Sequence, residues 1–91
     1  MKIKYKKILE YNMMQEMSIE EFADQENLVI NVFERVDTPN KKDRFFAYFE
    51  RCKVFGAGII IALFGNGATP EEAIADYAKI ISQNNLLLYC F

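Results

Sequence analysis

The chain has 91 residues, of which 52% are hydrophobic and 26% are charged. This length allows one domain with a small core, and the apolar content is typical of a folded globule rather than a disordered segment. The formal net charge of −2 excludes a strongly basic nucleic-acid-binding protein, and it is too weak for a protein that mimics DNA over its whole surface. We expect residues 1–16 to form an N-terminal extension and residues 17–91 to form a single domain.

The first helix has a clear start in the sequence. Residues 1–16 fit either an alternating strand or a helix, and both remain open. Ser18 is then a good N-cap, and Glu21 stands three residues later as its capping-box partner. The sequence therefore predicts a short helix from about Ile19 to Glu26.

Three strands are predicted next. Apolar residues alternate from Leu28 to Phe33, and the turn-forming residues 37–40 end that segment. The segment Arg44 to Val54 also alternates, and a glycine-containing connection joins it to the β-branched run Ile59 to Ile61. We expect these last two segments to form a hairpin.

A second helix follows the Gly65-Asn66-Gly67 turn. Thr69 is an N-cap, Pro70 takes the first helical position and Glu72 completes a second capping box. The predicted helix covers residues 70–82, with a buried stripe at helical spacing formed by Ile74, Tyr77, Ala78 and Ile81. Leu86 to Phe91 is uncharged and apolar, and we expect it to be a fourth strand.

The turn before this helix is not a phosphate-binding loop. Thr69 and Glu72 occupy the free backbone N–H groups that such a loop would offer to a phosphate. Glu71 and Glu72 also add negative charge where the phosphate would lie. Neither a GxxxxGK[ST] nor a GxGxxG motif is present. We expect a helix start whose acidic residues complement the helix dipole.

The sequence contains no constellation for catalysis or metal binding. It has no histidine, and the acidic pairs Glu20-Glu21 and Glu71-Glu72 are adjacent, so on a helix their side chains diverge by about 100°. Cys52 and Cys90 form no CxxC motif and favour two buried thiols. We therefore expect no enzymatic activity, no cofactor and no metal. The longest apolar run, residues 59–64, is too short to span a membrane, and we expect a cytoplasmic protein.

The order of helix, three strands and helix resembles the double-stranded-RNA-binding domain over about residues 18–82. The resemblance implies an α+β fold of order α-β-β-β-α with a further C-terminal strand, in which an antiparallel sheet packs against helix 70–82. The segment Pro70 to Ile74 carries acidic residues where that family has a lysine cluster, so nucleic-acid binding is not expected. GATPEEAIADYAKII also resembles the T-x-E-E-A helix start of HicB-like antitoxins, which neutralise a small toxin by direct contact.

RFFAYFERCKV followed by GNGATPEEAIADYAKIIS resembles a group of small phage- and prophage-encoded proteins. That resemblance implies a host-interaction role, of which the anti-CRISPR proteins are the best-known example. We therefore expect a viral inhibitor of a host defence system that binds a host protein, such as a nuclease, stoichiometrically. A HicB-like antitoxin that binds its toxin and a degenerate RNA-binding domain are the alternatives.

The predicted sheet has an apolar second face. If Phe45, Ala47 and Phe49 point toward the helix, the side chains that point away are Phe46 and Tyr48 together with Val29 and Phe33, and something should cover them. The cover could be the N-terminal extension, the first helix, a second copy or a foreign partner. The uncharged C-terminal strand could also complete the sheet or form a homodimer. The residues predicted to bind a partner combine acidic and aromatic side chains: Glu20, Glu21, Asp24, Phe46, Tyr48, Glu71, Glu72 and Asp76.

Overall fold

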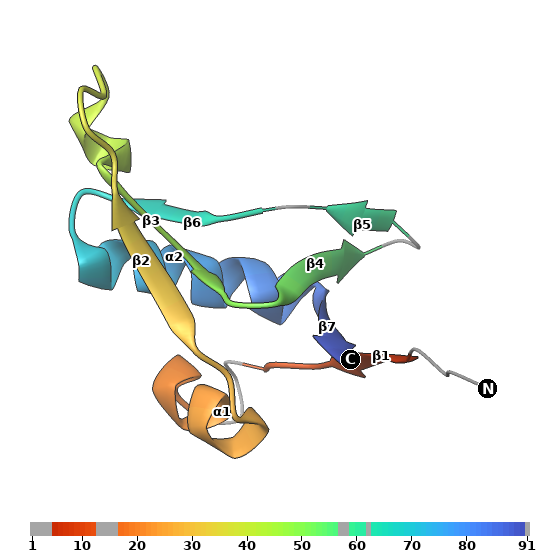
Figure 1. Ribbon diagram of the computed structural model, residues 1–91. Coiled ribbons are helices and arrows are strands. Elements are labelled where there is room, and N and C mark those ends of the chain that lie inside the picture. The colour runs from red at the N-terminus through yellow and green to blue at the C-terminus, as the bar shows by residue number, and fades with distance from the viewer. Residues whose placement is uncertain (1–4, 13–16, 57–58, 62, 91) are drawn as a thin grey trace.

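The computed structural model describes residues 5–12, 17–56, 59–61 and 63–90 and shows an α+β fold (Figure 1). Two helices, one short 3-10 helix and seven strands follow one another along these residues. In chain order they are β1 (Tyr5–Leu9), α1 (Ile19–Glu26), β2 (Ile30–Glu34), η2 (Lys41–Asp43), β3 (Phe45–Phe49), β4 (Cys52–Gly56), β5 (Ile59–Ile61), β6 (Gly65–Gly67), α2 (Pro70–Gln83) and β7 (Asn85–Cys90).

The strands form two antiparallel sheets, one with the order β1-β7-β4-β5 and one with the order β2-β3-β6. The predicted hairpin is present as β4 paired with β5, but its first arm, residues 44–54, contributes to both sheets. The segment expected as one strand, Arg44 to Val54, is divided into β3 and β4 by a turn at residues 50–51, where Arg51 has a φ of 61°. The division arises because β3 pairs with β2 while β4 pairs with β7.

The C-terminal strand β7 lies in the middle of the four-stranded sheet, between β1 and β4. Residues 1–16, which we expected to be an extension, supply β1, and Tyr5–Leu9 pairs with Leu86–Cys90. The strand interpretation therefore holds for residues 5–9, while residues 1–4 and 13–16 lie outside the described part of the chain. Because β1 and β4 pair with the two edges of β7 over residues 86–88, this part of the strand offers no free edge to a second copy.

Both helices begin as their sequences predict. The Ser18 hydroxyl oxygen accepts a hydrogen bond from the Glu21 N–H at 3.1 Å, and the Thr69 hydroxyl oxygen accepts one from the Glu72 N–H at 3.1 Å. The Glu72 carboxylate accepts the N–H of Ala68 at 3.0 Å. Local capping contacts thus define the first turn of α1 and of α2.

The core lies between the two helices and both sheets, and the four-stranded sheet contributes Leu9, Val54, Leu86 and Leu88 to it. Ala47 and Phe49 of β3 are fully buried beneath α2, which contributes Tyr77 and Ile81. Helix α1 joins the core through Phe22, whose ring lies 6.1 Å from that of Phe49. The predicted stripe of α2 is confirmed at Tyr77, Ala78 and Ile81, while Ile74 is half-buried against the core.

Strand β6 allows α2 to approach the sheet closely. We predicted that Gly65-Asn66-Gly67 breaks the third strand, but these residues pair with β3 as a short strand of their own. A Cβ atom on Gly65 would collide with the Ala73 carbonyl oxygen and the Tyr77 backbone nitrogen. A Cβ atom on Gly67 would lie 2.5 Å from the Ala73 backbone nitrogen. The two glycines are therefore needed because helix backbone occupies the space of a side chain.

Within the described part of the chain, no helix has the length and apolar character that a membrane span requires.

We predict that Gly65→Ala lowers the free energy of unfolding by roughly 3 kcal/mol or more, because the backbone of α2 must move. Gly56→Ala is the matched control. Its new Cβ would lie 2.5 Å from the side-chain oxygen of Asn84, and that side chain can rotate away, so a loss of about 1 kcal/mol is expected. Urea unfolding measures both variants, and equal losses would contradict the close-approach argument.

Burial of Tyr77, which is 1% exposed, makes stability depend on alkaline pH. Desolvation raises the Tyr77 pKa from 10.0 to about 12, and a backbone hydrogen bond with Phe49 offsets part of that rise. Because the folded pKa lies above the unfolded value, the stabilisation is complete below pH 10 and is lost as the pH rises toward 12.

We predict that the wild-type chain loses roughly 2–3 kcal/mol more than Tyr77→Phe over this pH window, since one pKa unit corresponds to about 1.4 kcal/mol. Thermal unfolding of both proteins at stepped pH measures the difference. Other titrating groups are common to the two proteins and cancel in the comparison. Parallel pH profiles would show that Tyr77 does not cause the alkaline loss.

Candidate functional site

The three-stranded sheet has a second face, opposite α2, that carries aromatic side chains. Strand register places Phe33 opposite Phe46 and Asn31 opposite Tyr48, so these side chains point to the same side of the sheet. Phe64, just before β6, packs against the same rings. We call this surface the aromatic face, and it consists of Phe33, Phe46, Tyr48 and Phe64.

The four rings of the aromatic face hold one another in place. Phe33 stacks on Phe46 with ring centroids 5.2 Å apart and on Tyr48 at 5.8 Å, with interplanar angles of 20° and 14°. Phe64 meets Phe46 and Tyr48 edge-on, each at 5.3 Å. Such offset and edge contacts are the favourable geometries for aromatic pairs. The four rings therefore support one another in this arrangement.

No described segment covers the aromatic face. Phe33 and Phe64 remain 45% and 40% exposed, while Phe46 and Tyr48 are half-buried. Helix α1 packs on the other side of the sheet, where Phe22 contacts Tyr11 and Phe49. The internal cover that we considered from the sequence, by the extension or the first helix, is thus absent from the described residues.

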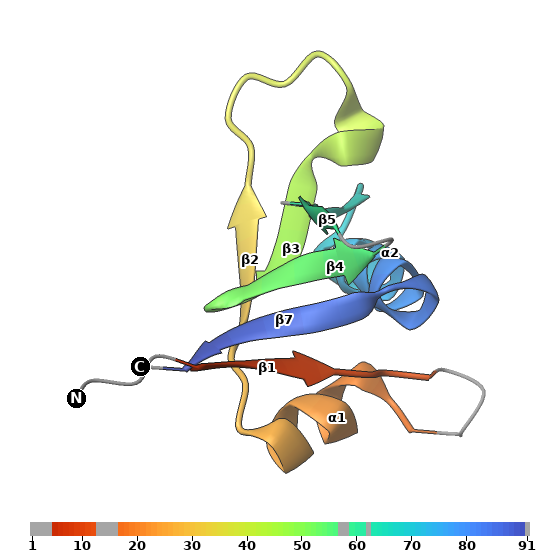
Figure 2. The same ribbon diagram turned by 90° about the vertical axis from the view of Figure 1, so that its right-hand side faces the viewer.

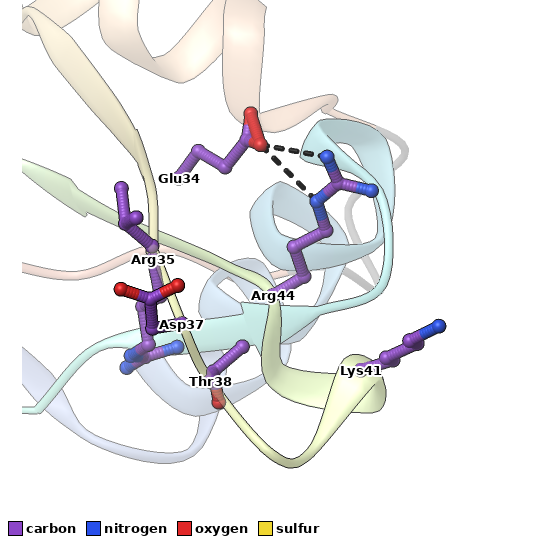
Figure 3. Close-up of a pocket in the computed structure, with 7 residues that line it drawn as sticks. Glu34, Arg35, Asp37, Thr38, Lys41 and Arg44 are labelled. Atoms are coloured by element: carbon purple, nitrogen blue, oxygen red, sulfur yellow. Dashed lines mark hydrogen bonds and ion pairs between the residues drawn. The ribbon is translucent and has the colours of Figure 1, made fainter.

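A cavity of about 310 Å³ lies beside the aromatic face, where the β2–β3 connection projects beyond the sheet (Figure 3). Arg35 lines this cavity and also contacts the aromatic face, because its guanidinium carbon lies 4.6 Å from the Phe46 ring centroid. The cavity is lined by Glu34, Arg35, Val36, Asp37, Thr38, Lys41 and Arg44.

The two arginines of this cavity already have partners. Arg35 donates a hydrogen bond to the Asp43 carbonyl oxygen at 2.5 Å. Arg44 forms an ion pair with Glu34, with nitrogen and oxygen 2.7 Å apart (Figure 3). The cavity therefore combines charges of both signs and is not a concentrated anion site.

The structure does not bring the eight predicted partner-binding residues together. Phe46 and Tyr48 lie on the aromatic face, whereas Glu71, Glu72 and Asp76 belong to α2 on the opposite side of the sheet. The remaining three lie on α1 and are exposed: Glu20, Glu21 and Asp24. Acidic and aromatic residues thus form separate surfaces.

Some of the predicted acidic residues have structural contacts. The Asp76 carboxylate accepts the backbone N–H of Asn66 at 2.8 Å and so ties α2 to β6. Glu72 accepts the Ala68 N–H, and Glu21 accepts a hydrogen bond from the Ser18 hydroxyl at 3.3 Å. Glu71 is exposed on the first turn of α2. Their contribution to partner binding stays a prediction.

Two members of the aromatic face, Phe33 and Phe64, and the adjacent Arg35 were not among the predicted partner-binding residues. Alternation along β2 did indicate that Phe33 shares a face with Phe46 and Tyr48. Phe64 could not be placed in this way, because its position depends on the register between β3 and β6. Arg35 lies beyond the predicted end of its strand.

The site has no features of a metal centre in the described residues, which contain no group of three or more His, Cys, Asp and Glu side chains able to hold an ion. Cys52 is half-buried and packs against the core. Comparisons with family models, curated proteins and solved structures found no match to this chain. Function must therefore be argued from the geometry of the aromatic face.

We predict that Asp76→Ala lowers the free energy of unfolding by about 1.5–3 kcal/mol, the usual contribution of a hydrogen bond to a charged group. Glu71→Ala, on the same helix, is the control and should change it by about 0.5 kcal/mol or less. Chemical unfolding of both variants measures the difference. Equal stabilities would show that the link between α2 and β6 is not important for folding.

Proposed function

We propose that this chain is a non-enzymatic protein-binding module that binds its partner stoichiometrically through the aromatic face. The observation that carries the proposal is a set of four ordered rings on an uncovered sheet face. Large contiguous apolar patches on soluble proteins usually mark interaction sites. Aromatic side chains are also enriched among the residues that dominate binding energy at protein interfaces.

A protein partner fits this face better than a single-stranded nucleic acid does. Nucleic-acid platforms combine free ring faces, on which bases stack, with cations that contact phosphates. Here Phe33, Phe46 and Tyr48 stack on one another, so part of each ring face is already occupied. Arg35 and Arg44 already have partners within the chain. The net charge of −2 adds no general attraction for phosphate.

The biological role in this proposal is inhibition of a host defence protein, such as a nuclease, in the cytoplasm of the host cell. The support for this role is the resemblance to phage- and prophage-encoded proteins. The exposed acidic residues of α1, Glu20, Glu21 and Asp24, would favour a basic partner through long-range attraction. The aromatic face would supply the short-range contact.

We predict that replacing both exposed rings, in the double variant Phe33→Ser and Phe64→Ser, weakens partner binding by roughly 30-fold or more. The tagged protein is first used to retain its partner from nuclease-treated host lysate, and the dissociation constant of the purified pair is then measured by calorimetry. Val36→Ser is the matched control, because Val36 is an exposed apolar residue in the β2–β3 connection and lies outside the aromatic face.

Circular dichroism of each variant separates lost binding from lost folding. Binding by the folded double variant as tight as that of the wild type would remove the aromatic face from the proposal. Retention of nucleic acid alone, in lysate without nuclease, would favour a nucleic-acid platform instead. Inhibition of the retained protein's activity by the wild type, and not by the double variant, would support the inhibitor role.

A further inference from the structure

Strand β2 is an edge strand of the three-stranded sheet, and within the described residues it pairs only with β3. Figure 2 shows β2 as the outer strand, with β3 on its inner side. An edge strand presents unpaired backbone N–H and C=O groups on its outer side. Which residues present them follows from the hydrogen bonds to β3.

The inward hydrogen bonds of this strand fall on odd-numbered residues. The Glu50 N–H donates to the Val29 carbonyl at 2.8 Å, and the Arg35 N–H donates to the Arg44 carbonyl at 2.7 Å. In an antiparallel pair the residues bonded to one neighbour alternate with residues whose polar backbone groups point the other way. Ile30, Val32 and Glu34 therefore direct their N–H and C=O groups outward from the sheet.

Little blocks this outer edge. Strand β2 has the sequence INVFE, which lacks the lysine or proline that commonly prevents edge pairing. Its one charged side chain, Glu34, is neutralised by the ion pair with Arg44. Val32 and Phe33 are 36% and 45% exposed. The edge has no net charge once this ion pair is counted, and no described residue is bonded to its outward backbone groups.

We propose that β2 pairs antiparallel with β2 of a second copy of this chain, around a twofold axis that passes beside Val32. In this register Val32 faces Val32 of the second copy, and Ile30 faces Glu34 of the second copy. Each outward N–H group of one strand then meets an outward carbonyl of the other. The three-stranded sheets of the two copies become one continuous sheet.

The self-complementarity of β2 favours a second copy over another extended segment. Like charges in directly opposed positions destabilise a strand pair. The proposed register contains no such pair. A shift by two residues in either direction leaves outward groups at the strand ends unpaired. The register also places Phe33 opposite Asn31 of the second copy on one side of the sheet. The two aromatic faces would therefore adjoin.

The dimer does not depend on the proposed function, which a monomer could also perform.

A charge-pair experiment tests the twofold axis. Wild type is expected to dimerise in a concentration series measured by sedimentation velocity. Val32→Lys and Val32→Glu should each weaken self-association by about tenfold or more, since each places like charges opposite one another. An equimolar mixture of the two variants should restore the dimer, because the introduced ammonium and carboxylate groups would then face each other across the axis. Leu63→Lys, at an exposed apolar residue before β6, is the matched control and should dimerise like wild type.

Hydrogen exchange of the wild-type chain provides a second measurement that needs no substitution. The amides of Ile30, Val32 and Glu34 should be protected at high protein concentration and lose that protection on dilution. Exchange at these amides that does not change with concentration would overturn the proposal, as would a monomer at every concentration. A dimer that is unaffected by both Val32 variants but lost on replacing Phe33 and Phe64 would place the contact on the aromatic face and overturn it too.

Discussion

The close approach of α2 to β6 is the contact on which the rest of the structure depends. Gly65 and Gly67 leave room for the helix backbone, and the Asp76 carboxylate bonds the Asn66 N–H between them. A helix fixed on one side of the sheet buries Ala47 and Phe49. Strand alternation then directs the neighbouring residues, Phe46 and Tyr48, to the other side. The position of α2 on one side of the sheet therefore determines which side carries the aromatic face.

The features that the sequence predicted well are those set by neighbouring residues. The starts of α1 and α2 follow from side chains that cap their first turns, and those contacts span only a few residues. The opposite orientations of Phe49 and Tyr48 follow from the two-residue period of a strand. The hairpin between residues 44–54 and 59–61 also depends on a short connection. Each of these features needed no knowledge of distant parts of the chain.

The features that the sequence did not predict depend on distant pairing. Nothing within residues 1–16 indicates that Leu86–Cys90 pairs with Tyr5–Leu9, so β1 could not be distinguished from an extension. The division of β3 from β4 reflects their different partners, β2 and β7. The acidic and aromatic residues of the predicted site could be separated only once the side occupied by α2 was known. All three features depend on contacts between residues that are far apart in the sequence.

The basic residues of the β2–β3 connection lie next to the aromatic face, and two of them, Arg35 and Arg44, already have partners within the chain. Lys41, Lys42 and Arg44 lie close together in the β2–β3 connection, and Arg35 is beside them. The Arg35 guanidinium, however, lies over the Phe46 ring and bonds a backbone carbonyl, while Arg44 is held by Glu34. The Arg35 guanidinium thus extends the aromatic face at Phe46, whereas the Arg44 guanidinium lies 5.5 Å from the Phe45 ring centroid and pairs with Glu34. In the proposed interface, recognition would therefore depend on shape and apolar contact more than on net charge.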